Sequence, residues 1–376
     1  MKFSCLQENL NKGLSIVSRF ISTRPQLPVL SNILLIAKKD NLSLKATNLE
    51  SGITYKVGVK IEEEGEITIP AKTLSELVSQ LPADKVDFLL EENNLKINCQ
   101  RFQARIAGLP ATEFPPLPES SGKPNLSFKT EEISAPVSQV SFAAAQDESR
   151  PVLSGVRIFN QDKGLTLVAT DGFRLSVVGL PTVVSAQPID LLLPSRTLIE
   201  VVRILAEEGE KEFGLEITKE TNQAVFSLGR ADIVCRLLEG QFPNYEKIIP
   251  HGFNTHIVVN KDELAAAIKT AAIFAREAAN IIKFEIHPSA SSGPKFQISA
   301  NAPQVGENTV ELEAKVEGEN AEIAFNCRFL QDLLGIVSSE DIIFEMTSSL
   351  SPGVFKIAGN ANFLHLIMPV RVNPEG

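Results

Sequence analysis

The sequence predicts an α+β fold of three similar domains, each with two helices packed on antiparallel sheet. Three observations lead to this prediction. Motifs recur along the chain at a fixed spacing, each copy runs helix, strands, helix, strands, and the 376 residues exceed what one typical core requires. The expected domains are residues 1–121, 125–250 and 253–376, joined by polar linkers that contain Gly and Pro.

The repeat is clearest in two pairs of motifs. "PVLSN" at 28–32 returns as "PVLSG" at 151–155, and "LSLKATNLE" at 42–50 returns as "LTLVATDGF" at 165–173, both at an offset of 123 residues. A weaker third copy, "FQISANAPQ", occupies 296–304. Two matches at one offset indicate duplicated domains.

Each copy is expected to begin with a helix. The third copy opens with Asn260 and Glu263, a variant of the capping box. In the second copy, Pro136 predicts a helix that begins late or kinks. In the first copy, an apolar stripe recurs every three or four residues, and it comprises Leu6, Leu10, Leu14, Val17 and Ile21.

Strands of alternating pattern, such as "NLSLKAT" and "GLTLVAT", come next and precede a second helix. That helix is marked by "IPAKTLSELVSQL" (69–81), which matches "LPSRTLIEVVRIL" (193–205) and, more loosely, "FNCRFLQDLLGIV" (325–337). Further strands follow, and "EFPPLP" (113–118) and "QFPNYEKIIP" (241–250) close the first two copies. In the first copy, the buried face of this second helix is expected to consist of Leu74, Leu77, Val78 and Leu81.

The stretch "ATDGFRLSVV" (169–178) has two interpretations. An active-site loop would use Asp171 as a base and Arg174 as an anion clamp. A hairpin turn would use Asp171 and Gly172, because Asp-Gly is a common hairpin signal. The repeat favours the turn, since Thr47-Asn48-Leu49 and Ala300-Asn301-Ala302 stand at the matching positions and Asx residues suit turns.

Composition excludes several classes of protein. A hydrophobic fraction of 43% with 22% charged residues is typical of a soluble globular protein. No apolar run could span a membrane and no signal-peptide pattern opens the chain, so a cytoplasmic protein without membrane partners is expected. The four cysteines lie far apart and are expected to be reduced and buried. With four scattered histidines, they predict neither a metal site nor a cofactor.

The basic residues are more informative than the net charge of −10, which alone argues against a protein that coats nucleic acid. Lys12 and Arg19 lie seven apart on the first helix, as do Lys269 and Arg276 in the third copy. Solvated faces would explain any one of these residues, whereas the whole set predicts a surface that binds phosphates without reading sequence. Each second helix also has a basic residue in its first turn, at the same repeat position, although positive charge there opposes the helix dipole. These residues are Lys72, Arg196 and Arg328.

Several phrases extend this interpretation along nearly the whole chain: "MKFSC", "RPQLPVLSNILL", "LSLKATNLE", "QDESRPVLSGV", "LVATDGFRL", "QFPNYEKIIP", "AREAANIIKFEI" and "MPVR". In this order they resemble the bacterial sliding clamps, the beta subunits of the replicative DNA polymerase. The resemblance implies the DNA clamp fold, with two chains closing head to tail into a six-domain ring. It also implies a non-catalytic processivity factor for DNA replication. Its expected partners are duplex DNA, the replicative polymerase subunit, the clamp loader and other replication or repair proteins.

The resemblance implies three sets of site residues and no catalytic residue. A pocket for partner peptides, between the second and third domains, would use Leu153, Thr170, Gly172, Phe173, Arg174, Leu175, Pro243, Lys247, Ile248, Leu366, Met368, Pro369, Val370 and Arg371. The residues facing DNA would be Lys12, Arg24, Lys72, Gln146, Arg150, Arg196, Arg203, Arg276 and Arg328. The dimer interface would use Ala104, Ile106, Ile273 and Phe274, with flanking ion pairs from Glu307, Glu311 and Glu313.

Some positions depart from the well-known members of that family. Phe173 stands where they have His, Lys247 where they have Arg, and Val152 where they have an aromatic residue. A more apolar pocket with an altered peptide preference is therefore expected. Ala104 likewise replaces an aromatic residue, and "VNPEG" (372–376) extends the tail towards the pocket.

Two alternatives remain at this point. A hydrolase that uses Asp171 with Arg174 would need a nucleophile or a metal partner, and the sequence offers no convincing set. A repeat-built peptide-binding scaffold that never encloses DNA would tolerate charge reversal at the basic helix starts. Core packing is also a sufficient explanation, without the resemblance, for Leu153, Leu175, Ile248 and Leu366.

Overall fold

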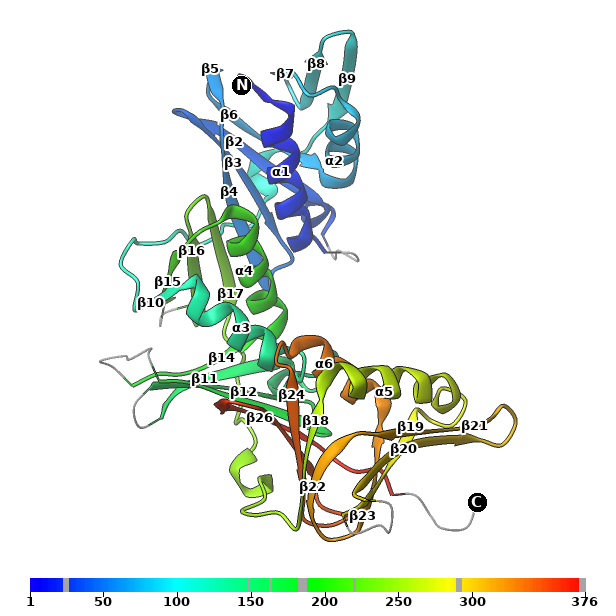
Figure 1. The fold of residues 1–376 in the computed structure, drawn as a ribbon. Coiled ribbons are helices and arrows are strands. Elements are labelled where there is room, and N and C mark those ends of the chain that lie inside the picture. The colour runs from blue at the N-terminus through cyan, green and yellow to red at the C-terminus, as the bar shows by residue number, and fades with distance from the viewer. Residues whose placement is uncertain are drawn as a thin grey trace. The chain divides into compact units, whose positions relative to one another are not determined.

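The computed structural model describes residues 1–22, 27–147, 149–161, 164–181, 188–218, 221–288 and 293–371 (Figure 1). The chain divides into two compact units, each described by itself below. The first unit comprises Met1–Glu131 with Glu200–Leu237, and the second comprises Glu132–Ile199 with Leu238–Gly376. The division passes through the second of the three repeats, so each unit joins one complete repeat to part of the second.

The first unit contains two antiparallel sheets. The smaller has the strand order β5 (Lys60–Glu63), β1 (Lys2–Leu6), β7 (Lys85–Glu91), β8 (Asn94–Cys99) and β9 (Phe102–Ala107). The larger has the order β10 (Leu126–Lys129), β15 (Glu212–Thr218), β16 (Gln223–Leu228), β17 (Ala231–Arg236), β4 (Ser51–Gly58), β3 (Asn41–Thr47), β2 (Asn32–Lys38) and β6 (Gly65–Pro70).

The second unit also contains two antiparallel sheets. The larger has the order β14 (Asp190–Pro194), β11 (Gly155–Gln161), β12 (Gly164–Thr170), β13 (Arg174–Leu180), β26 (Asn360–Ile367), β25 (Gly353–Ile357), β24 (Asp341–Met346), β18 (Thr255–Asn260) and β22 (Ala314–Gly318). The smaller has the order β21 (Gly306–Leu312), β20 (Lys295–Ala302), β19 (Ile281–His287) and β23 (Ala321–Asn326).

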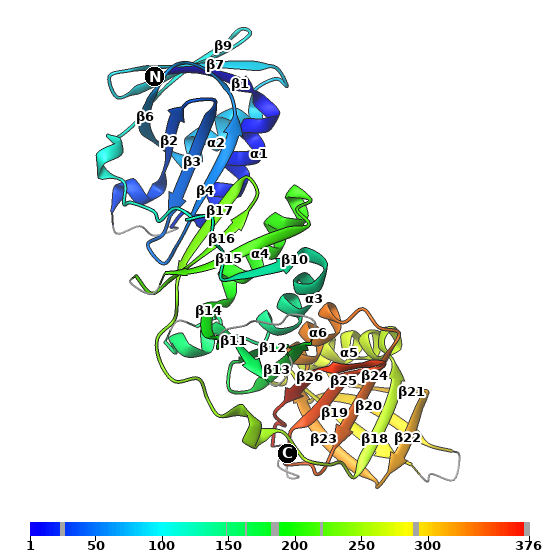
Figure 2. The same ribbon diagram turned by 90° about the vertical axis from the view of Figure 1, so that its left-hand side faces the viewer.

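The helices cover these sheets as pairs, as the predicted α+β class requires. In the first unit, α1 and α2 lie side by side against β2, β3 and β4, and in the second unit α5 and α6 lie together beside β19 and β20 (Figures 1 and 2). The helix bounds are α1 (Gln7–Val17), α2 (Ala71–Gln80), α3 (Thr130–Ser141), α4 (Ser195–Glu208), α5 (Lys261–Ala275) and α6 (Cys327–Ile336). Short 3₁₀ turns are η1 (Ser18–Phe20), η2 (Pro28–Ser31), η3 (Ala111–Glu113), η4 (Pro151–Ser154) and η5 (Tyr245–Ile248).

Consecutive repeats are joined through shared sheets. In the first unit β4 of the first repeat pairs with β17 of the second, so that Ile53 lies opposite Ile233. In the second unit β13 of the second repeat pairs with β26 of the third, so that Leu175 lies opposite Leu366. We call these strand pairs the first junction and the second junction.

Several local predictions are confirmed. Asn260 caps α5, where its side chain accepts hydrogen bonds from the backbone N–H groups of Asp262 and Glu263. Lys72, Arg196 and Arg328 are each the second residue of their helix. The four cysteines are buried free thiols, and burial raises the pKa of Cys5 to about 12.

Four local predictions are wrong, wholly or in part. Each repeat begins with a strand and not with a helix, since β1, β10 and β18 precede α1, α3 and α5. Leu6 is the last residue of β1 and is 56% exposed, because strand and helix follow each other directly and α1 begins only at Gln7. Of the two outcomes predicted from Pro136, the late start is wrong, since helix α3 begins at Thr130, more than one turn ahead of the proline. The third copy has no turn at Asn301, because strand β20 continues to Ala302, which pairs with Gly306.

Candidate functional site

The motif that opens the site is the turn between β12 and β13. Asp171 Oδ1 accepts hydrogen bonds from the backbone N–H groups of Phe173 (2.8 Å) and Arg174 (2.9 Å). Thr170 Oγ1 donates to the carbonyl of Arg174 (2.7 Å) and accepts from the N–H of Gly172 (3.0 Å), whose φ is +92°. The polar side chains therefore stabilise the turn itself, as the hairpin interpretation predicts.

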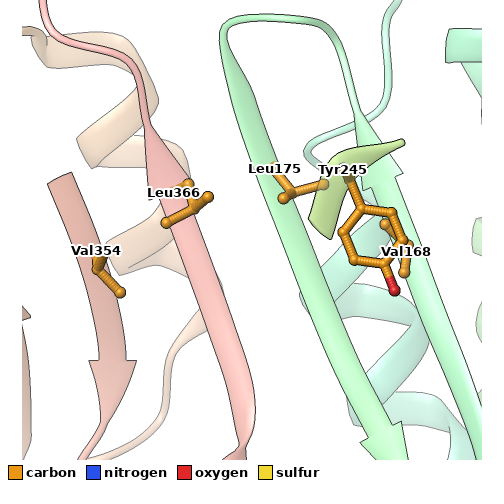
Figure 3. Packing of buried hydrophobic residues seen from close by; sticks show 5 residues of the cluster. All are labelled: Val168, Leu175, Tyr245, Val354 and Leu366. Carbon is orange, nitrogen blue, oxygen red and sulfur yellow. The ribbon is translucent and has the colours of Figure 1, made fainter. Parts of the chain in front are cut away.

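Five buried apolar side chains gather where the second and third repeats pair (Figure 3). In register, Leu175 on β13 lies opposite Leu366 on β26, and Leu366 lies opposite Val354 on β25. Tyr245 of η5 packs with both strands, and in Figure 3 its ring lies in front of Val168 and beside Leu175. We call this set the junction cluster: Val168, Leu175, Tyr245, Val354 and Leu366.

The segment around η5 adds both apolar and polar groups. Tyr245 is 5% exposed, and its burial, together with the nearby charge of Glu246, raises the pKa of its hydroxyl. Phe242 and Ile249 pack against the junction cluster from either side of the 3₁₀ turn. The predicted pocket residues Pro243 and Lys247 are exposed on the same short segment.

Three large apolar side chains next to the junction cluster in sequence remain exposed. Phe173 is 58% exposed, Ile248 45% and Met368 37%. The backbone N–H of Met368 donates to the carbonyl of Phe173 (2.8 Å), which holds the end of β26 against the turn. We call Phe173, Ile248 and Met368 the apolar rim. A buried apolar cluster beside an exposed apolar rim can take an apolar anchor from a partner.

A polar layer lies inside the same junction. Arg174 is 6% exposed and makes ion pairs with Asp171 Oδ2 (3.0 Å from Nε) and Asp332 Oδ2 (2.6 Å from Nη1). Ser176 and His365 lie opposite each other on β13 and β26, and Ser176 Oγ is 2.6 Å from His365 Nδ1. Burial, with the charge of Arg174 as a second cause, lowers the pKa of His365 to about 3.

The other predicted pocket residues surround these groups unevenly. Thr170 is buried in the turn, and Leu153, Pro369 and Val370 are half-buried. The backbone N–H of Val370 donates to the carbonyl of Ala324 (2.8 Å), while Arg371 is exposed. The tail 372–376, which was expected near the pocket, lies outside the described residues.

The residues predicted to face DNA fall into two groups. On helix starts and loops, Lys72, Gln146, Arg150, Arg196, Arg276 and Arg328 are exposed. The second group pairs with acids of α4, Lys12 with Glu208 (2.7 Å) and Arg203 with Glu207 (3.2 Å). Glu207 also pairs with Arg19 at 2.8 Å. Lys72 of the first group lies 3.9 Å from Glu76 of its own helix. Arg24 lies outside the described residues.

The predicted interface residues differ in exposure. Ile273 is 59% exposed and Phe274 is half-buried, whereas Ile106 is only 7% exposed and packs within its own repeat. Ala104 is half-buried on β9. Glu307, Glu311 and Glu313 are exposed on or just after the edge strand β21, and Glu311 pairs with Lys295 (3.4 Å).

Sequence reasoning missed several residues that the structure brings to these places. Tyr245 belongs to the quoted motif "QFPNYEKIIP", where it directly follows Pro243 and Asn244. Its place in this motif could have indicated that it belongs to the site. Val354 and Asp332 reach the site only through the pairing of distant strands and helices, which no local pattern reveals. Phe102, 53% exposed on β9, precedes Ala104 by two residues and so shares its face of the strand.

Two further kinds of feature are absent from the residues that the structure describes. These residues hold no cluster of three or more His, Cys, Asp or Glu side chains that could bind a metal ion. None of the helices in the described ranges is long and apolar enough to cross a membrane.

Comparison with known proteins gives a consistent result over the whole chain. Family models of the DNA polymerase III beta subunit match its N-terminal domain at residues 1–118, its central domain at 127–244 and its C-terminal domain at 246–371. The chain is similar to the beta sliding clamp of Synechococcus elongatus, at 34% identity over 99% of this chain and 100% of the relative. It is also similar to that of Pseudomonas aeruginosa, at 31% identity with the same coverage.

Solved structures agree. The beta subunit of DNA polymerase III from Thermotoga maritima superposes with a TM-score of 0.90 at 28% identity, covering 99% of this chain and 100% of the other. A Pseudomonas aeruginosa sliding clamp bound to griselimycin superposes with a TM-score of 0.89 at 30% identity and the same coverage.

Proposed function

Because the chain belongs to the DNA polymerase III beta subunit family, we propose that two copies close into a ring around duplex DNA and bind partner proteins at the second junction. As a DNA sliding clamp it is a processivity factor and not an enzyme. Tethering raises the effective concentration of a polymerase at its template without requiring tight contact between ring and DNA. The polymerase subunit, the clamp loader and other replication or repair proteins are the proposed partners.

The observation that carries the partner site is the apolar rim beside the junction cluster. The rim exposes Phe173, Ile248 and Met368, while Leu175 and Leu366 of the junction cluster are each 1% exposed. A peptide with one or two large apolar side chains would cover the rim, while the buried Leu175 and Leu366 stabilise the strands that carry it. Lys247, exposed on the same segment as Ile248, would add one cationic contact for an acidic group of the peptide.

A rim variant tests this site. We expect Phe173→Ser with Ile248→Ser and Met368→Ser to weaken binding of the replicative polymerase subunit by at least about tenfold, because the apolar anchor loses its cover. Surface plasmon resonance measures the Kd. The matched control is Leu350→Ser, which removes an apolar side chain that is 64% exposed on another turn of the same unit. Equal binding by the rim variant and the wild type would contradict the site.

For DNA we propose the exposed basic helix starts, Lys72, Arg196 and Arg328, as the main phosphate contacts. The acid partners of Lys12, Arg19 and Arg203 reduce the net positive charge of that group. Charge reversal at the three helix starts is expected to impair loading and sliding. The contact between the wild-type ring and DNA is expected to weaken as the salt concentration rises. The scaffold alternative predicts no change, so retention on nicked circular plasmid distinguishes the two. Linearising the plasmid should release the wild-type ring.

For the dimer we propose that β9 of one chain meets β21 and α5 of its partner. Both strands end their sheets, and an unpaired edge is able to pair with another chain. Phe102 supplies an exposed aromatic ring two residues from Ala104, and exposed Ile273 with half-buried Phe274 supply the opposite apolar surface. Arg101 directly precedes β9 and Arg105 lies on it, whereas Glu307 and Glu311 lie on β21, so the two edges carry opposite charge.

The mass in solution tests this interface. Phe102→Glu is expected to give a monomer at micromolar concentration, because it buries a carboxylate in an apolar contact. Phe253→Glu is the matched control, since Phe253 is similarly exposed (51%) on a different surface. Light scattering should give about twice 40.9 kDa for the wild type and the control. A Phe102→Glu protein that remains dimeric would contradict the proposed seam.

A further inference from the structure

Arg174 is placed to do something other than contact a partner. Its guanidinium is bonded to Asp171 and Asp332, and it lies over two aromatic rings, 4.7 Å from the centroid of Phe329 and 5.4 Å from that of Phe142. An arginine that is 6% exposed needs such partners, because a buried charge without them is costly. These contacts engage Nε and Nη1, and at 6% exposure little of the side chain is open to a ligand.

The partners of Arg174 come from three different elements. Asp171 lies in the turn between β12 and β13, and Phe142 directly follows α3, both in the second repeat. Phe329 and Asp332 lie three residues apart on α6 of the third repeat, which places them on one face of that helix. Arg174 therefore ties the turn that carries Phe173 to a helix of the next repeat.

Two neighbouring side chains of the turn, Phe173 and Arg174, differ sharply in exposure. Phe173 is 58% exposed, while Arg174 is 6% exposed. The carbonyl of Phe173 accepts the N–H of Met368, so the position of the turn also fixes one end of the apolar rim. A shift of Arg174 would thus move Phe173 and Met368 together, without removing either side chain.

The first junction supports this interpretation, because it uses an acid at the same helix position. By the repeat offsets, Glu200 of α4 corresponds to Asp332 of α6, Arg19 to Phe142, and Ser51 to Arg174. In the first unit Arg19 Nη1 lies 3.4 Å from Glu200 Oε2. Each junction therefore joins one arginine to the equivalent acid, but only in the second junction does the arginine come from the turn.

We propose that Arg174 is a positioning residue: through Asp171 and Asp332 it latches the turn to α6, and so holds the apolar rim in its binding arrangement. This inference rests on the proposed function of the rim as the partner site. It predicts that the affinity for partners depends on Asp332, a residue of α6 that belongs to neither the rim nor the junction cluster.

The test compares Asp332→Asn with Asp332→Glu, using the purified replicative polymerase subunit as the probe in surface plasmon resonance. Asp332→Asn removes the charge that holds Nη1, and we expect the Kd to rise roughly tenfold. Asp332→Glu keeps the charge and is expected to restore most of the affinity. Glu277→Gln, which neutralises another exposed acid of the third repeat, is the control and should bind as the wild type does.

Hydrogen exchange adds a readout that a loss of stability alone would not produce. In Asp332→Asn, the amides of residues 171–174 are expected to exchange faster, while those of β24 and β18 stay protected. Faster exchange throughout the second unit would contradict the proposed role of Arg174. Equal weakening of binding by Asp332→Asn and Asp332→Glu would contradict it as well.

The rim variant separates this inference from the function on which it rests. If the rim variant binds weakly and Asp332→Asn binds normally, the latch is wrong and the partner site stands. If neither change affects binding, the proposed partner site fails as well.

Discussion

The turn at 47–51 and the turn at 170–174 have the same hydrogen bonds but different surroundings. Thr47 Oγ1 donates to the carbonyl of Ser51 (2.9 Å) and accepts from the N–H of Leu49 (3.0 Å), as Thr170 does with Arg174 and Gly172. Asn48 Oδ1 accepts the N–H groups of Glu50 and Ser51, as Asp171 Oδ1 accepts those of Phe173 and Arg174. The turn chemistry alone therefore does not make a binding site.

The residues that differ between the two turns explain why only one is a candidate site. Phe173 on the rim corresponds to Glu50, and the buried Leu175 corresponds to Gly52. At Gly52, a Cβ atom would meet the side chain of Leu117 at 2.7 Å, so a residue of the same chain already occupies that space. Leu117 thus fills the first turn at the position of Leu175, and one large apolar side chain, Leu49 (45%), stays exposed there. At the second turn the rim exposes three.

The largest expected effect comes from removing the arginine of each junction. Arg174→Met leaves Asp171, 15% exposed, without its charged partner, so we expect the second unit to lose about 3–5 kcal/mol of stability. Arg19→Met removes ion pairs near the surface and is expected to cost the first unit no more than about 1 kcal/mol. Urea unfolding followed by hydrogen exchange in each unit measures both. Equal losses would remove the distinction between the junctions.

A pH titration sharpens the comparison, because only the second junction buries a histidine. His365 faces Ser176, Phe142 and Arg174, and Arg174 in turn is paired with Asp171 and Asp332. Its folded pKa of about 3 lies below its ordinary value of 6.5, so the unfolded chain binds the proton first as the pH falls. Stability of the second unit should therefore decrease from pH 6.5 towards pH 3, by roughly 2 kcal/mol at pH 5.

The control for this titration is His365→Gln, which cannot titrate. We expect its stability to vary less than that of the wild type between pH 6.5 and pH 3, measured by urea unfolding at each pH. Parallel profiles for the two proteins would show that another group causes the dependence.

The smallest expected effect concerns the backbone of the two turns. Leu49 has φ +77° and Gly172 has φ +92°, a region that suits glycine. Gly172→Ala is expected to cost roughly 1 kcal/mol, and Leu49→Gly to stabilise the first unit by up to about 1 kcal/mol. Thermal unfolding measures both changes. A destabilising Leu49→Gly would mean that the Leu49 side chain contributes more than its strained backbone costs.

Much of the fold could be predicted from the sequence, because the repeat supplied three copies of each pattern. The helix positions of Lys72, Arg196 and Arg328 and the Asx turns at Asn48 and Asp171 follow from local rules. The length of the paired strands did not follow from local rules. The turn predicted at Asn301 is therefore absent, because the strand continues through that residue.

The site was harder to predict than the fold. Local patterns contain the turn and the exposed Phe173, but they cannot show that Val354, Leu366 and Asp332 come together with them across the second junction. Nor could spacing show that acids of α4 would pair with Lys12 and Arg19. Such pairs depend on how repeats associate, which is a property of tertiary packing.

The central claim is that the second of these two turns, and not the first, binds partner proteins. Hydrogen exchange of the clamp with and without the replicative polymerase subunit tests it most directly. We predict protection at residues 170–175, 245–249 and 366–370, with no change at residues 47–52. Protection at 47–52, or none at the second junction despite binding, would contradict the account.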